Sequence, residues 1–225
     1  MKIRYNAPVI LTFSLIAVAI QLFNDNVYPG FSEYYFLVGP SMSVTDYLDY
    51  FRLFSHVLGH ANWEHLLSNL TFILLLGPIL EEKYGGLNMF IMILTTALVI
   101  GLINVAFFDT GLFGASGIVF MLITLVSIVD IEEGAIPLTY VLVVSIFIGK
   151  ELLDIVNYDE ISQMAHIVGG VLGALFGFVL AEDNARKAPR SYQSSISKSL
   201  KSNSKSNDKS NNRSNRLNKS YGKQR

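Results

Sequence analysis

The 225-residue sequence contains no cysteine, and acidic and basic side chains make up only 16% of it. Without cysteine, the chain forms neither disulfides nor thiolate metal sites. Soluble domains carry about 25% charged residues, so the low charge and the hydrophobic content of 51% exclude an ordinary soluble domain. Several apolar runs approach or exceed the roughly 18 residues that mark a helix crossing a bilayer. The sequence therefore predicts a polytopic membrane protein.

Six apolar segments are candidate membrane spans. They cover approximately residues 8–23, 65–80, 87–108, 116–129, 135–156 and 161–181. The first two are separated by a long loop rich in aromatic side chains, a composition that suits the headgroup layer. We therefore predict an all-α bundle of six transmembrane helices within a membrane domain of residues 1–183. Residues 184–225 are rich in Ser, Asn and Lys and have too little apolar surface to fold, which predicts a disordered cytoplasmic tail.

The basic residues predict the orientation of the chain. Lys2 and Arg4 precede the first apolar segment, and Arg186–Arg225 holds 12 of the 17 Lys and Arg residues. Flanks rich in Lys and Arg stay on the cytoplasmic side, so both termini are expected there, which agrees with an even number of spans. We expect a multi-pass protein of the plasma membrane whose tail is either a solubilising extension or one that contacts anionic lipids. So sparse a basic run does not indicate nucleic-acid binding.

Four polar side chains from different segments fall at a similar predicted depth. With a rise of 1.5 Å per residue from the inner end of each segment, Ser116 lies at roughly 21 Å, His166 and His65 at roughly 24 Å, and Asn69 at roughly 18 Å. In a hydrocarbon core about 30 Å thick, all four lie in the outer half. Polar groups inside a bilayer are costly and face a protein interior or a wet cavity. The pattern indicates one site that opens to the outer side.

The residue types at this depth favour acyl transfer by a serine nucleophile. A serine beside an imidazole is activated because the histidine acts as general base and later as general acid; Ser116 and His166 fit these roles. The oxyanion of the intermediate needs hydrogen-bond donors, which His65, the Asn69 amide and the backbone N–H of Ser116 would supply. No cofactor or metal is required for this chemistry.

Glycines lie near Ser116 and near His166 in the sequence. They are Gly114, Gly117, Gly169 and Gly173. Glycine beside the serine leaves room for substrate and for neighbouring backbone. Small residues four apart allow two membrane helices to come close together. We therefore predict that segment 161–181 packs against segment 116–129 and brings His166 to Ser116.

Taken together, these motifs resemble the rhomboid family of intramembrane serine proteases. The matching motifs are His56-x3-His60-x4-His65-x3-Asn69, Gly114-Ala115-Ser116-Gly117 and Ala165-His166-x2-Gly169-x3-Gly173, with Arg52 and Glu81 also fitting. The resemblance covers roughly residues 45–181, and the motifs follow in family order on the expected spans. One departure is Phe120, which stands where the family often has a tyrosine that stacks on the catalytic histidine.

The resemblance implies a six-helix core with a Ser–His dyad of Ser116 and His166. It implies structural roles for the other motif residues, which are His56, His60, Arg52, Glu81, Gly114, Gly117, Gly169 and Gly173. Substrates would be single-span membrane proteins that are cut within the bilayer near the outer face. The partners expected are therefore transmembrane proteins and lipids, whereas nothing in the sequence indicates the oligomeric state.

Two other functions stay open from the sequence. The spacing of His56 and His60 suits two zinc ligands on one helical turn, with His65 as a third, which would make the chain a metal-dependent membrane enzyme or transporter. However, Glu64 is the one carboxylate near them, and a metal site leaves the Ser116 motif unexplained. The other alternative is a relative of the same fold that binds transmembrane helices without cleaving them.

Overall fold

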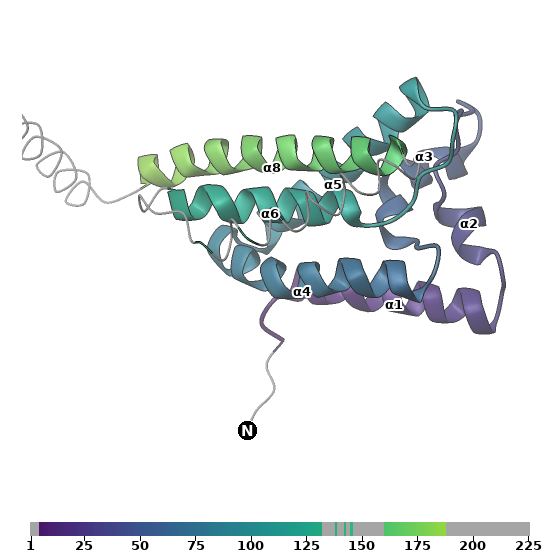
Figure 1. Ribbon diagram of the computed structural model, residues 1–225, viewed down its shortest axis with the longest axis horizontal. Coiled ribbons are helices and arrows are strands. Elements are labelled where there is room, and N and C mark those ends of the chain that lie inside the picture. The colour runs from purple at the N-terminus through teal and green to yellow at the C-terminus, as the bar shows by residue number, and fades with distance from the viewer. Residues whose placement is uncertain (1–4, 132–137, 139–141, 143–144, 146–159, 188–225) are drawn as a thin grey trace, which may run out of the picture. The chain divides into compact units, whose positions relative to one another are not determined.

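A computed structural model describes residues 5–131, 138, 142, 145 and 160–187 of the chain. The elements in these ranges are α1 (Pro8–Asn26), α2 (Phe31–Phe36), α3 (Tyr47–Ser55), the 3-10 helix η1 (His56–Leu58), α4 (Trp63–Tyr84), α5 (Gly86–Phe107), α6 (Ser116–Ile131) and α8 (Glu160–Lys187). Helices α1, α4, α6 and α8 run side by side, with α2 and α3 at one end (Figure 1). The predicted all-α class is confirmed.

Four described helices are long and apolar enough to cross a membrane. They are Pro8–Asn26, Trp63–Tyr84, Gly86–Phe107 and Gln163–Leu180. They correspond to the first, second, third and sixth predicted spans. The predicted fourth span is the shorter α6, whose 16 residues extend about 24 Å and so do not cross a hydrocarbon core about 30 Å thick. The predicted fifth span, residues 135–156, lies almost wholly outside the described residues.

Helix α8 continues past the end predicted for the sixth span. Residues up to Val179 belong to one compact unit, and a second unit begins at Leu180. The described part of the second unit is the end of α8, which is helical as far as Lys187. The tail predicted over residues 184–225 otherwise lies outside the described residues.

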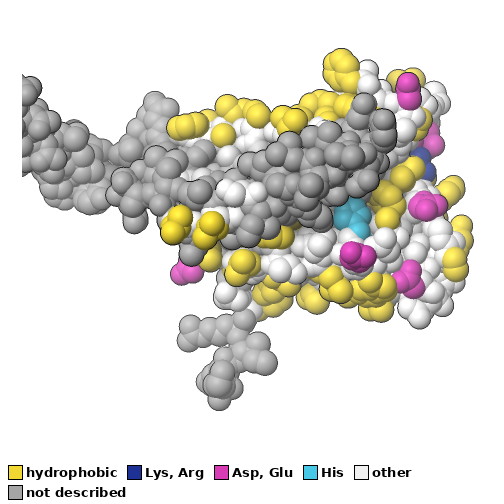
Figure 2. Space-filling view, viewed as in Figure 1, with side chains coloured by type: hydrophobic (Ala, Val, Ile, Leu, Met, Phe, Trp, Pro, Cys, Tyr) yellow, Lys and Arg dark blue, Asp and Glu magenta, His cyan; other side chains and the backbone are white. Residues whose placement is uncertain are grey.

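The surface of the described helices agrees with a membrane environment. Among the described residues, Figure 2 shows hydrophobic side chains along the length of the bundle. Many of the charged side chains lie near the end where α2 and α3 are. Large apolar side chains on the spans are exposed, among them Leu75, Ile79, Leu87 and Phe178. In water such a surface would be unfavourable, whereas lipid tails solvate it.

Part of the loop of residues 24–64, which the sequence predicts for the headgroup layer, packs against the side of α5. It contains α2, α3 and η1, and it descends along α5. A side chain on Gly101 would lie 3.0 Å from the carbonyl oxygen of Leu53, and the Nε2 of His56 lies 3.0 Å from the carbonyl oxygen of Ala97. Ala97 is ten residues before the end of α5, so η1 reaches about 15 Å below that end.

Helix α1 begins at a carboxylate from the far end of α4. Ala7, the residue before α1, provides no side-chain cap. Instead, the Oε1 and Oε2 atoms of Glu81 accept hydrogen bonds from the backbone N–H groups of Val9 and Ile10, each at 2.9 Å. The first N–H groups of a helix have no partner within it, and a negative charge at this end also favours the helix dipole. Glu81 therefore joins α1 to α4.

We predict that Glu81→Ala destabilises the protein by about 1–3 kcal/mol, because it leaves two N–H groups of α1 without their acceptors. The matched control is Glu82→Ala, which removes an exposed carboxylate from the neighbouring position. Thermal unfolding of both variants in detergent measures the difference. Equal melting temperatures for the two variants would contradict the role of the Glu81 carboxylate as a helix cap.

Candidate active site

Helices α6 and α8 are in backbone contact at two glycines of α8. A Cβ atom on Gly169 would lie 2.1 Å from the carbonyl oxygen of Gly117, and a Cβ on Gly173 would lie 2.3 Å from that of Met121. Both distances are shorter than any real contact, so no side chain fits at either position. The prediction that segment 161–181 packs against segment 116–129 is confirmed, and the spacing of the glycines is the reason for it.

This contact places His166 beside the first turn of α6. Ser116 is the first residue of that helix. One turn further on, the ring of Phe120 stacks on the His166 imidazole, with centroids 4.3 Å apart and planes 18° apart. Residues four apart share a helix face, so Ser116 and Phe120 both face α8. His166 is only 6% exposed, and its imidazole therefore lies in a protected layer between the two helices.

The loop before Ser116 is held by residues from distant parts of the chain. The backbone N–H of Gly114 donates to the carbonyl oxygen of His56 at 2.9 Å, and the N–H of Ala115 donates to the Nε2 of His60 at 3.3 Å. Earlier in the loop, Val38 and Leu112 exchange two backbone hydrogen bonds of 2.9 Å. The segment from α2 to His60 therefore fixes the backbone from which the serine projects.

His56 and His60 act on this loop as neutral groups. The Nε2 of His56 faces the carbonyl oxygen of Ala97, and the Nδ1 of His60 faces that of Leu58 at 3.3 Å. A carbonyl accepts, so these nitrogens carry the hydrogen, which leaves the His60 Nε2 free to accept from Ala115. Burial lowers the pKa of His56 to about 4. Burial, and then the neighbouring His65, lower the pKa of His60 to about 3.

His65 and Asn69 approach the same loop from α4. Gly114 has a φ of +124°, and a Cβ on it would lie 2.6 Å from the Cε1 of His65. The imidazole of His65 therefore lies directly against the glycine two residues before Ser116. Asn69 is one turn further along α4, is 4% exposed, and its Nδ2 has no hydrogen-bond partner among the described residues. Both side chains are on the face of α4 that packs toward α6.

Two residues of the motif set lie away from this cluster. Arg52 forms a salt bridge of 2.7 Å with Asp49 and donates to the carbonyl oxygen of Tyr34, so it joins α3 to α2. Glu81 lies 16 residues after His65, about 24 Å further along α4, where it caps α1. The structure thus brings together the serine, histidine and glycine motifs with His65 and Asn69, and it separates Arg52 and Glu81 from them.

The histidines do not converge on one point in the way a zinc site requires. The helical turn expected for His56 and His60 ends at Leu58, and their rings bond different backbone groups. His60 and His65 are closer, with ring centroids 5.0 Å apart and the rings edge to face. Among the residues that the structure describes, no group of three His, Cys, Asp or Glu side chains is arranged to hold a metal ion.

Asn104 is a buried residue of the site region that the sequence motifs do not include. Its Nδ2 donates to the carbonyl oxygen of Thr110 at 3.1 Å, and its side chain is fully buried. It ties the end of α5 to the loop that leads to Ser116. A polar amide inside an otherwise apolar predicted span is a signal that would have found it, because such groups face a protein interior.

Comparison with known proteins agrees with the motif pattern. A family model described as the rhomboid domain matches residues 47–183. The chain is 26% identical over 136 residues to the rhomboid protease GlpG of Haemophilus influenzae, covering 57% of this chain and 68% of that protein. It is 24% identical over 139 residues to the chloroplastic rhomboid-like protein 11 of Arabidopsis thaliana, covering 55% of this chain and 50% of that protein.

We predict that Gly169→Ala separates α6 from α8, because the added methyl group would meet the Gly117 carbonyl oxygen. Overpacking of this kind costs about 1–3 kcal/mol and would lower the melting temperature. The control is Gly170→Ala on the same helix, where a Cβ meets only the Thr124 Oγ1 at 3.4 Å, an ordinary contact. A Gly169→Ala variant that melts no lower than Gly170→Ala would contradict the backbone contact.

We also predict that acid destabilises the protein through His56 and His60. Their folded pKa values lie below the ordinary 6.5, so the unfolded chain binds protons more readily. Their contribution to stability is complete above pH 6.5 and is lost as the pH falls from 6.5 towards 3–4. Melting temperatures of the wild type, His56→Gln and His60→Gln between pH 7.5 and 4.5 measure this effect. Each variant should show a smaller decrease than the wild type, and unchanged decreases in both would contradict the prediction.

Proposed function

The chain belongs to the rhomboid family, and we propose that it is an intramembrane serine endopeptidase with Ser116 as nucleophile and His166 as general base. The family consists in general of serine proteases that act on transmembrane proteins in the bilayer. The observation that carries the proposal is the joint packing of α6 on α8. The Gly117–Gly169 contact and the Phe120–His166 stack put the only histidine of α8 beside the helical turn that begins with Ser116.

In the proposed reaction, the Ser116 Oγ attacks the carbonyl carbon of the scissile peptide bond as the His166 imidazole takes its proton. His166 then gives the proton to the leaving amine, and an acyl ester on Ser116 remains. Water attacks this ester with His166 again as the base, which releases the carboxyl product and restores the serine. The stack with Phe120 supports this proposal, because a general base must stay within hydrogen-bond reach of the proton it takes and the stack restrains the imidazole beside Ser116.

The negative oxygen of the tetrahedral intermediate needs donors that are already in place. We assign this role to the backbone N–H of Ser116, to the His65 imidazole and to the Nδ2 of Asn69. Three observations support the assignment. The N–H of Ser116 is at the N-terminus of α6, where the helix dipole favours negative charge; His65 touches Gly114; and the Nδ2 of Asn69 is buried without a protein partner among the described residues.

The proposed substrates are single-span membrane proteins that are cleaved near the outer face of the plasma membrane, with both termini of the enzyme in the cytoplasm. The apolar helices support a membrane location, and the basic residues near each terminus support the orientation. Since α6 is shorter than the hydrocarbon core, Ser116 would lie below the membrane surface. A scissile bond therefore has to enter the bilayer to reach it.

The test is cleavage of a model single-span substrate, together with labelling by a fluorophosphonate probe. Ser116→Ala is expected to abolish both signals, and His166→Ala to lower cleavage by about 10²–10⁴-fold because it removes the general base. Ser127→Ala is the matched control, since Ser127 is on the same helix and bonds the Ile123 carbonyl oxygen; it should keep full activity.

Two outcomes would overturn the proposed function. Equal cleavage by the wild type and Ser116→Ala would exclude the serine as nucleophile, and sensitivity of that cleavage to chelators would favour a metal enzyme. Binding of substrate helices with no cleavage and no probe labelling of the wild type would instead indicate a non-catalytic relative.

A further inference from the structure

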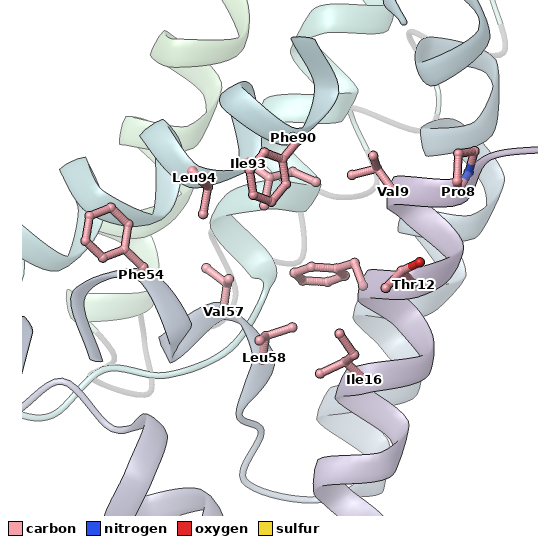
Figure 3. A pocket seen from close by; sticks show the side chains of 11 residues that line it. Pro8, Val9, Thr12, Ile16, Phe54, Val57, Leu58, Phe90, Ile93 and Leu94 are labelled. Carbon is pink, nitrogen blue, oxygen red and sulfur yellow. The ribbon is translucent and has the colours of Figure 1, made fainter. Parts of the chain in front are cut away.

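A cavity of about 410 Å³ lies apart from the proposed catalytic residues, between α1, α5 and the stretch from the end of α3 through η1 (Figure 3). This size is within the range of small-ligand pockets. Phe13 and Ile16 line it from α1, Phe54 and Leu58 from the α3–η1 stretch, and Leu94 from α5. Among the described residues of the lining Thr12 is the only polar one, and its hydroxyl bonds the Tyr5 hydroxyl at 2.8 Å. The cavity thus offers hydrocarbon surface to whatever fills it.

The position of the cavity exposes it to lipid rather than to water. It follows α1 from Pro8 to Ile16, about 12 Å along the helix axis, and α1 and α5 are both long and apolar enough to cross the membrane. Its rim is continuous with the lipid-facing surface, because Ile16, Phe54 and Phe90 are 40–49% exposed. Water gains too few hydrogen bonds in an apolar site to occupy it stably, whereas lipid tails surround the opening.

We propose that this cavity is a binding site for one acyl chain of a membrane phospholipid. The shape of the lining supports a flexible chain over a transmembrane helix. Close helix packing in membranes uses small residues. The eleven lining residues that the structure describes include no glycine or alanine and are mostly large. The polar, basic tail of the protein does not fit an apolar cavity, since its Lys, Asn and Ser side chains would lose their hydration.

An acyl chain in this site would support the loop before Ser116. The side chains of Val57 and Leu58 line the cavity. The flanking residues His56 and His60 bond the backbone N–H groups of Gly114 and Ala115, and the Leu58 carbonyl faces the His60 Nδ1. An occupant that packs against η1 therefore stabilises the same segment that fixes the loop. This effect on activity rests on the proposed function, whereas binding of the lipid does not.

Binding is tested on the full-length protein in detergent, titrated with a phosphatidylcholine that carries a photoactivatable diazirine in one acyl chain. Adducts are mapped by mass spectrometry of the peptides. We expect saturable labelling, one lipid per protein, on the stretches 8–16 and 90–94. Leu94→Trp fills the cavity, and Ile16→Trp fills its rim in case the first variant fails to fold; each should lower labelling by about tenfold. Ile91→Trp is the control, because Ile91 is 48% exposed on the same helix and does not line the cavity.

Labelling that does not saturate, or that both filling variants leave at the wild-type level, would overturn the acyl-chain site. So would a dimer that both filling variants dissociate, as measured by light scattering, because it would identify a second copy as the occupant.

The effect on activity is measured by fluorophosphonate labelling of delipidated protein before and after phosphatidylcholine is added back. Lipid should raise the labelling rate of the wild type and of Ile91→Trp several-fold, and should leave that of Leu94→Trp unchanged. An equal stimulation of Leu94→Trp would overturn the link from the cavity to the loop. Saturable lipid labelling in a protein that the probe never labels would overturn the proposed function and leave the acyl-chain site standing.

Discussion

Hydrocarbon offers no hydrogen-bond partners, so backbone that leaves a helix inside a membrane has to be satisfied by the protein itself. In the proposed membrane placement the loop before Ser116 is such backbone. Its last two N–H groups before the serine bond the carbonyl oxygen of His56 and the ring of His60. These acceptors belong to a segment that descends along α5 and is held there by the Ala97 carbonyl oxygen. The position of the proposed nucleophile therefore depends on histidines about 50–60 residues earlier in the chain.

Histidine suits this task because a neutral imidazole offers one donor and one acceptor on opposite sides of a rigid ring. His60 uses both at once, with its Nδ1 toward the Leu58 carbonyl and its Nε2 toward the Ala115 N–H. Lys and Arg would supply donors only. Burial lowers the pKa of His60 to about 3, so the ring stays neutral and keeps its acceptor. Burial removes the His60 ring from water, but it also keeps the Nε2 unprotonated, so that this atom can accept the hydrogen bond from the Ala115 N–H.

The sequence predicted the parts of the structure that follow from periodicity and composition. The spans follow from apolar runs, and the α6–α8 contact follows from Gly169 and Gly173 at a four-residue spacing. The packing of η1 against the side of α5 was not predictable, because an aromatic-rich segment with no strong period resembles a surface loop. Contacts to backbone atoms, such as that of His56 with the Ala97 carbonyl oxygen, cannot be predicted from residue types, because every residue has a backbone carbonyl. The acceptors that Glu81 provides to Val9 and Ile10 lie more than 70 residues away in the sequence.

Asn69 illustrates how the proposed site and the stability of the fold oppose each other. A buried donor without a partner costs about 1–3 kcal/mol, and an apolar side chain of similar size would fill the same space on α4 without that cost. The Nδ2 of Asn69 has no partner among the described residues, yet it shares a helix face with His65, which touches Gly114. In the proposed mechanism, this donor gains a hydrogen bond when a negative oxygen forms beside Ser116. The Asn69 amide then makes a hydrogen bond in the transition state that it lacks in the resting protein. Interactions that are stronger in the transition state than in the ground state are the ones that accelerate a reaction.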